Sequence, residues 1–147
     1  MKYISTTLIE VLLKSIDRVG IKKTIKVLEI TQNSVNDIEL IKGAIILNTC
    51  NSFAISEKTL INGRKNVANR TNAIGVCALL LVRMCKLTQR EVAYILKKEP
   101  SNINKYLKKY DNLDKNFKND LEILFKIQEI ERETLEFYDK NKKINNG

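Results

Sequence analysis

Residues 87–110 read LTQREVAYILKKEPSNINKYLKKY and decide the fold. Thr88 is a favourable N-cap residue, and Glu91, three positions later, completes a capping box. Two apolar stripes follow at helical spacing, the first formed by Val92, Ile95 and Leu96 and the second by Ile103, Tyr106, Leu107 and Tyr110. The pattern predicts two amphipathic helices joined by a short turn, which is a helix-turn-helix.

The residues around the expected turn support this prediction, with one departure. Ala93 supplies the small side chain needed where the two helices approach, and Pro100 fits the first turn of the second helix, where its missing N–H is harmless. Lys97 stands where such motifs often carry glycine. Because a left-handed lysine costs about 1 kcal/mol, the turn could also take another shape.

The second helix would leave a polar and basic face open, made of Ser101, Asn102, Asn104, Lys105, Lys108 and Lys109. Hydrogen-bonding and cationic side chains suit base edges and phosphates. We therefore predict that Ser101, Asn102 and Lys105 contact bases in the major groove of DNA. An ordinary helical hairpin with a solvated basic face would show the same pattern.

Phosphate contacts are predicted on both sides of this helix. Thr88 and Gln89 begin the first helix, whose N-terminal amides and dipole favour an anion. The flanking cations, Lys97, Lys98, Lys108 and Lys109, would position the duplex without reading its sequence.

The positive charge of the chain is concentrated in this region. Residues 58–110 hold twelve Lys and Arg against two Asp and Glu, a net charge of +10, whereas residues 1–57 carry +1 and residues 111–147 carry −2. Such localisation suits a polyanion-binding face. A basic membrane-surface helix would show an apolar face rich in Trp or Phe, and the chain has no Trp and four scattered Phe.

Composition predicts an all-α fold and argues against an enzyme. Five Gly and one Pro in 147 residues are too few for the many turns of a β fold. With no histidine and no glycine-rich phosphate loop, the chain offers no catalytic residues of the usual kinds, no nucleotide site and no metal site. We expect no cofactor. Cys50, Cys77 and Cys85 form no C-x-x-C pair, and Cys77 and Cys85, eight apart on the apolar face of one helix, should be buried free thiols. The apolar run 73–82 is too short to span a bilayer, and no signal peptide is seen, so we expect a cytoplasmic protein.

Three segments are expected along the chain. Residues 1–35 form an N-terminal extension with two helices, 3–17 and 21–30, and residues 31–36 are turn-like. Residues 36–138 form a DNA-binding domain, and residues 139–147 form a basic, disordered tail. The domain is expected to contain helices at 38–51, 56–61, 67–85 and 113–138 around the helix-turn-helix, and its helix 67–85 is apolar nearly all round, as in a central core helix.

The motifs of residues 38–137 resemble those of a known family. Residues 53–60 match an F-x-I/V-x-x-x-x-L segment, Gly63-Arg64-Lys65 form a basic loop, and Arg70, Ala73 and Leu79-Leu80 match an R-x-x-A-x-x-L helix. Thr88, Glu91, Val92, Ala93 and Leu96 match the first half of the family's helix-turn-helix. The stretch is similar to the C-terminal DNA-binding domain of the bacterial replication initiator DnaA, a Trp-repressor-like fold.

This resemblance implies a further DNA contact and a changed specificity. The family places an arginine of the basic loop in the minor groove, so Arg64 is the matching base contact and Lys65 an adjacent phosphate contact. Glu99 and Pro100 fall on the Asp and His positions of the family's base-reading hexad. Because proline donates no hydrogen bond, the family's preferred site is not expected to be the preferred site here.

The sequence thus predicts a double-stranded DNA-binding protein without ATPase activity, acting in replication or transcription control, of a kind that phages and mobile elements could encode. The alternative is a helical interaction module that binds or inhibits a replication or transcription protein. Residues 1–35 are the candidate surface for a homodimer or a replication-protein partner.

Overall fold

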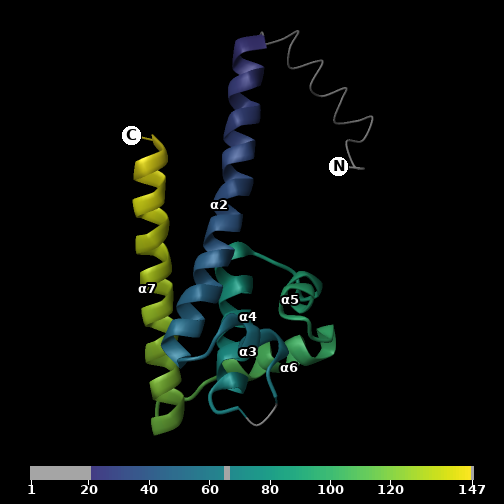
Figure 1. The fold of residues 1–147 in the computed structure, drawn as a ribbon, viewed down its shortest axis with the longest axis vertical. Helices are drawn as coiled ribbons and strands as arrows, with labels where there is room; N and C mark the ends of the chain where they lie inside the picture. Colours follow the sequence, from purple (N-terminus) through teal and green to yellow (C-terminus); the bar gives the residue numbers. More distant parts are fainter. Residues whose placement is uncertain (1–20, 65–66, 147) are drawn as a thin grey trace. The chain divides into compact units, whose positions relative to one another are not determined.

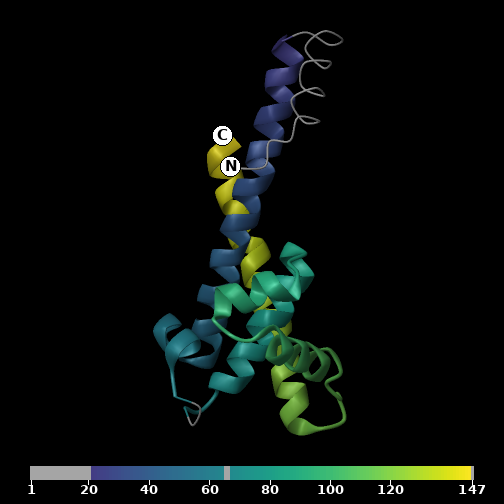
Figure 2. The ribbon, with the colours of Figure 1, turned by 90° about the vertical axis from the view of Figure 1, so that its right-hand side faces the viewer.

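The computed structural model describes residues 21–64 and 67–146, with side chains described for 37–64 and 67–141. Throughout these ranges the regular structure is helical, which confirms the all-α prediction. The helices are α2 (Ile21–Phe53), α3 (Glu57–Asn62), α4 (Arg70–Cys85), α5 (Gln89–Leu96), α6 (Pro100–Asp111) and α7 (Lys118–Asn146), as Figures 1 and 2 show. The chain divides into two units, residues 1–38 and 39–147. The second unit contains the predicted helix-turn-helix.

Helix α4 is the centre of the second unit, as its apolar sequence predicted. It contacts α3, α5, α6 and α7, and its side chains are buried almost without interruption from Ala73 to Leu81. A helix that is apolar all round is stable only when other elements cover every side. The helix begins at Arg70 rather than at residue 67, because Asn69 before it has the left-handed backbone conformation (φ 69°).

Helix α2 corrects the prediction for its part of the chain. Residues 31–36, expected as a turn, are helical, and one helix replaces the two expected at 21–30 and 38–51. The stretch TQNSVN is polar but contains neither Gly nor Pro. Thr, Asn and Ser cost a helix at most about 0.7 kcal/mol each, so polarity alone does not end it. The helix predicted at residues 3–17 lies outside the described residues.

Helix α7 differs from the prediction at both ends. It begins at Lys118 rather than at residue 113, because residues 113–117 form a turn in which the Asp114 side chain accepts a hydrogen bond from the Asn116 amide (2.9 Å). It also continues to Asn146, so the predicted disordered tail is helical up to that residue. No Gly or Pro precedes Gly147 in the tail, and its lysines suit the negative end of a helix dipole.

Side chains of α7 fasten it to the end of α2. Lys126 Nζ donates a hydrogen bond to the Ser52 carbonyl (2.9 Å) and lies 4.4 Å from the centre of the Phe53 ring. Further along, Asn48 Nδ2 donates to Thr134 Oγ1 (3.1 Å). The lysine satisfies a carbonyl at a helix C-terminus, where positive charge is favoured. These contacts complete the framework that supports α4.

The three cysteines are buried free thiols, as predicted for Cys77 and Cys85. Burial is the main cause that raises the pKa of each thiol, and the effect is greatest for Cys77 in α4. A thiol held protonated is a poor nucleophile and a poor metal ligand. The cysteines therefore act here as small apolar core residues.

Candidate nucleic-acid interface

The N-terminus of α5 carries the predicted capping box. The Thr88 side chain accepts a hydrogen bond from the Glu91 amide (3.2 Å), and the Thr88 amide donates to Glu91 Oε1 (3.3 Å). The Thr88 hydroxyl also donates to Glu91 Oε1 (3.0 Å). Since this hydroxyl is engaged within the box, the donors that this helix end can offer to a phosphate are the first-turn amides of Gln89 and Arg90.

The turn between α5 and α6 takes the shape that glycine usually supplies. Lys97 is left-handed, with φ 52° and ψ 51°. The Lys98 amide donates to the Ala93 carbonyl (2.9 Å) and the Lys97 amide to the Tyr94 carbonyl (3.4 Å), which is the Schellman pattern. The other shape, considered from the sequence, is not adopted. Pro100 follows as the first residue of α6, as predicted.

Replacing Lys97 with glycine should stabilise the protein by about 0.5–1 kcal/mol. Glycine adopts the left-handed conformation without the steric penalty that a Cβ brings. Urea unfolding followed by circular dichroism would measure the change as a higher midpoint with an unchanged slope.

Two further variants control for this result. Lys86 ends α4 with φ 57°, so Lys86→Gly should be stabilising for the same reason. Tyr94 lies in the middle of α5 and is 86% exposed, so Tyr94→Gly should be destabilising. A loss of stability in Lys97→Gly equal to that in Tyr94→Gly would contradict the strain argument.

The two helices pack through the predicted stripes and leave the predicted face open. Val92, Ala93, Leu96, Ile103 and Tyr110 are buried. On the opposite side of α6 lie exposed polar and basic side chains, namely Ser101, Asn102, Lys105, Lys108 and Lys109. The structure thus brings the three predicted base-contact residues of α6 together on one solvent-facing surface.

The basic loop between α3 and α4 is held by a buried arginine. Arg70 is 7% exposed, and its guanidinium donates to the carbonyls of Thr59 (2.8 Å, from Nε) and Ile61 (3.3 Å, from Nη2) in α3. Gly63 ends α3 by donating to the same Thr59 carbonyl, and a Cβ at this position would collide with Thr59 and meet the Arg70 side chain at 3.1 Å. Arg70 and Gly63 therefore set the path of the chain into the loop that carries Arg64.

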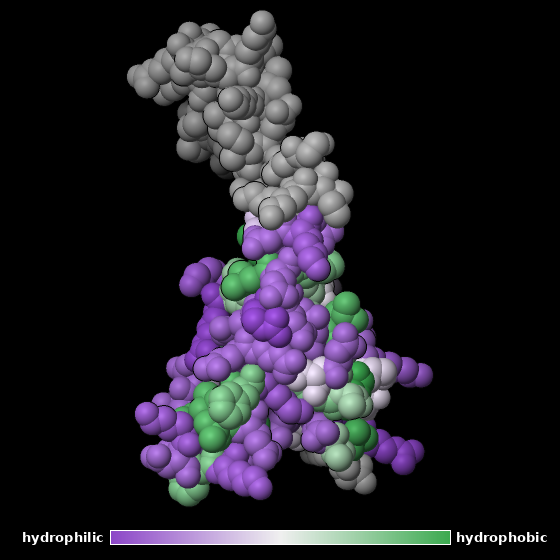
Figure 3. All heavy atoms as spheres, turned by 90° about the vertical axis from the view of Figure 1, so that its left-hand side faces the viewer, coloured by the Kyte–Doolittle hydropathy of each residue, from purple (hydrophilic) through white to green (hydrophobic). Residues whose placement is uncertain are grey.

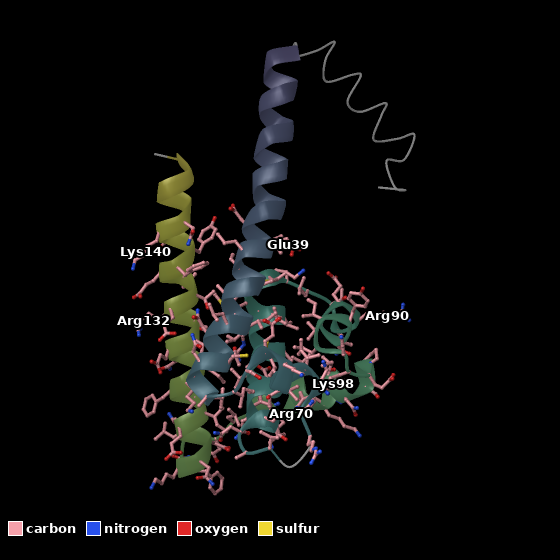
Figure 4. The ribbon with its side chains drawn as sticks, in the orientation of Figure 1. Glu39, Arg70, Arg90, Lys98, Arg132 and Lys140 are labelled. Atoms are coloured by element: carbon pink, nitrogen blue, oxygen red, sulfur yellow. The ribbon has the colours of Figure 1, made fainter. Side chains whose placement is uncertain are left out.

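Arg64 itself is exposed, whereas Lys65 lies outside the described residues. Burial and, secondarily, the charge of Arg70 lower the pKa of Lys98, which indicates that the turn between α5 and α6 lies close to Arg70 at the start of α4. Arg70 and Lys98 are labelled in Figure 4, on neighbouring elements. Lys98, in the turn between α5 and α6, and Arg70, which anchors the loop of Arg64, therefore lie near each other.

Several side-chain contacts of this region were not predicted from the sequence. Gln89 Nε2 donates a hydrogen bond to Asn104 Oδ1 (3.2 Å) and so links the start of α5 to α6. On another side of α5, Arg90 and the exposed Tyr94 line a hollow of about 310 Å³ together with Lys42. From the sequence, Arg70 was matched only to the R-x-x-A-x-x-L motif, and Asn104 was placed on the open face of the second helix but not among the predicted base contacts.

Acidic side chains are scarce around the proposed interface. Glu91 is engaged in the capping box, and Asp111, at the end of α6, pairs with Arg83 (2.7 Å). Glu99, at the start of α6, remains exposed. A phosphate backbone would therefore meet a surface with a large excess of positive charge.

Comparison with family models, with characterised proteins and with solved structures gives no match. In the described part of the chain, no helix is both long and apolar enough to cross a membrane. The same residues contain no cluster of acidic or cysteine side chains that could hold a metal ion.

Proposed function

We propose that this protein binds double-stranded DNA in a sequence-dependent manner through α5 and α6. The observation that carries the proposal is the open face of α6, where Ser101, Asn102, Lys105, Lys108 and Lys109 are exposed together. A rigid helix that presents amides and lysines fits the width of the major groove and the chemistry of its floor and walls. The resemblance to the DnaA C-terminal domain supports the same use of this helix.

The loop after α3 supports a second contact. Arg64 is exposed on a loop that Arg70 anchors from the inside. A guanidinium that enters a narrow minor groove gains from its enhanced negative potential. In this proposal Arg64 reads the minor groove and Lys65 contacts the adjacent phosphate. The proposed role of this binding is control of replication or transcription.

Binding to another protein is the second candidate, and exposed apolar residues favour it. Phe117, directly before α7, is 64% exposed, and Phe125 and Leu135 of α7 are 60% and 51% exposed. Figure 3 shows apolar side chains at the surface on the side of the molecule where α7 lies. Such side chains are more common at protein interfaces than on free surfaces.

A salt titration distinguishes the two candidates. The affinity for a fluorescein-labelled duplex of random sequence should fall linearly on a log–log plot, with a slope of about −0.9 for each phosphate contacted. Lys108→Ala should weaken binding to all sequences alike and reduce the magnitude of this slope by about one. Fluorescence anisotropy across a series of salt concentrations measures both quantities.

Lys140 provides the matched control. It is an exposed lysine on α7, well separated from Lys98 in Figure 4, so Lys140→Ala should leave the slope unchanged. If the wild-type protein shows little duplex binding even at low salt, DNA binding is wrong and the interaction module is favoured. A changed sequence preference in Lys108→Ala, with an unchanged slope, would make Lys108 a base contact instead.

A further inference from the structure

The hydrogen bond between Gln89 and Asn104 joins two residues on the side of the unit that the proposed function assigns to DNA. Gln89 is the first residue of α5, and Asn104 lies in the second turn of α6. Asn104 is partly buried, whereas Ser101 and Lys108, three and four positions away on the same side of the helix, are exposed. The amide of Asn104 therefore lies at the edge of the open face, hydrogen-bonded to Gln89, which is itself exposed.

This bond determines which end of the Asn104 amide faces outward. Its Oδ1 accepts from Gln89 Nε2 (3.2 Å), so the Nδ2 group is left to donate. Asparagine offers both donors and an acceptor, and here the bond from Gln89 occupies one side of the acceptor oxygen and leaves both Nδ2 hydrogens available. Because this bond restricts the side chain in the folded protein, less rotamer freedom is lost when it binds a ligand.

We propose that Asn104 is a specificity-determining residue that donates to a base acceptor in the major groove, and that Gln89 is the residue that positions it. The inference rests on the proposed function. The acceptors displayed in the major groove are O6 and N7 of guanine, N7 of adenine and O4 of thymine. Cytosine presents only an N4 donor there, so an Asn104 that turns its Nδ2 group toward the base disfavours cytosine on the strand that it contacts.

The proposal makes Asn104 different from the lysines beside it. A lysine that contacts phosphate holds the duplex in place for every sequence. A fixed amide donor against a base edge instead loses its hydrogen bond when the wrong base is present, which leaves a desolvated group unpaired. The effect of Asn104 should therefore appear at one base pair of the binding site.

Selection of bound sequences from a random duplex pool tests this with the wild-type protein and four variants. Asn104→Ala should lose the preference at one position of the wild-type site and bind that site about 5- to 100-fold more weakly. Gln89→Ala should relax the same position, and the double variant should be no worse than Asn104→Ala. In Asn104→Asp the carboxylate can still accept from Gln89 but has no donor, so selection at that position should shift toward cytosine, which presents only a donor in the major groove.

Gln128→Ala supplies the matched control, because Gln128 is an exposed amide on α7, and it should select the wild-type site unchanged. Thermal unfolding confirms that each variant is folded. If Asn104→Ala weakens all duplexes equally, Asn104 is a phosphate contact and the proposal is overturned. Unchanged selection by Asn104→Ala also overturns it, while leaving DNA binding intact. If the wild-type protein enriches no sequence, sequence-dependent binding itself fails, and the two failures are distinguishable.

Discussion

Replacing Gly75 with alanine is expected to cost about 3 kcal/mol of folding stability or more. Gly75 lies in the middle of α4, and a Cβ there would fall within the ring of Tyr110 from α6, only 2.6 Å from Cζ and closer still to Cδ2 and Cε2. Overpacking of a filled core costs about 1–3 kcal/mol and sometimes more. Here the added methyl meets an aromatic ring rather than the flexible end of a side chain, so the upper part of that range applies.

Tyr110 has little freedom to move away. It is 1% exposed, and its hydroxyl donates a 2.6 Å hydrogen bond to Asn72 Oδ1, one turn before Gly75 in α4. The pKa of this hydroxyl is raised to about 12, mainly by burial and to a smaller extent by the nearby Tyr106 and Asp120. Displacing the ring would break this bond and leave buried polar groups unpaired. Urea unfolding of Gly75→Ala would measure the total decrease in the free energy of unfolding.

Gly43 offers the matched control, because a Cβ at this helical glycine would meet nothing within 4 Å. Gly43→Ala should be about 0.5–1 kcal/mol more stable than the wild type, since alanine is the better helix former. Tyr110→Ala removes the obstructing ring at the expense of a cavity. Adding Gly75→Ala to that variant should therefore cost much less than it costs alone. Wild-type stability in Gly75→Ala would contradict the packing argument.

Replacing Arg70 with alanine is expected to lower the free energy of unfolding by about 3 kcal/mol. The side chain is buried and satisfies the carbonyls of Thr59 and Ile61 at the end of α3. Hydrogen bonds from charged groups contribute about 1.5–3 kcal/mol each. Without Arg70 the Ile61 carbonyl loses this donor, and the Thr59 carbonyl keeps the Gly63 amide. Arg70→Lys should recover little, because a lysine lacks the planar fork that reaches two carbonyls.

Arg64 provides the comparison that separates stability from DNA binding. Its side chain is exposed, so Arg64→Ala should leave the urea midpoint unchanged while weakening binding to a selected duplex. Arg70→Ala should lower both the urea midpoint and the affinity for the duplex, because the loop that carries Arg64 loses its anchor. Anisotropy titrations beside urea unfolding would show this. Equal midpoints for the two variants would mean that Arg70 does not hold the end of α3.

Features set by neighbouring residues were predictable from the sequence. The Thr88 capping box, Pro100 at the first position of α6 and the buried stripe of α6 were predicted and are present. Each depends on residues within one or two helical turns of each other, where spacing determines which groups can meet. The burial of α4 on all sides was predictable because few polar residues interrupt it.

Helix ends that depend on weak local preferences were less predictable. The turn expected at residues 31–36 is part of α2, and α7 begins five residues later than the expected start at residue 113. Propensity differences below about 1 kcal/mol per residue do not decide such boundaries. At Lys97 the sequence left two shapes open, and the surrounding packing imposed the strained one.

By itself, then, the sequence determined the helical class, the helix-turn-helix and the location of its positive charge, because periodicity and composition are local properties. The tertiary structure decided which distant residues meet. Tyr110 and Asn72 are 38 positions apart, Arg70 and Thr59 are 11 apart, and Gln89 and Asn104 are 15 apart. Helix packing determines these partners. The shape of a ring, the geometry of a hydrogen bond and the space beside a glycine must all fit in the same arrangement. No spacing rule along one helix contains that information.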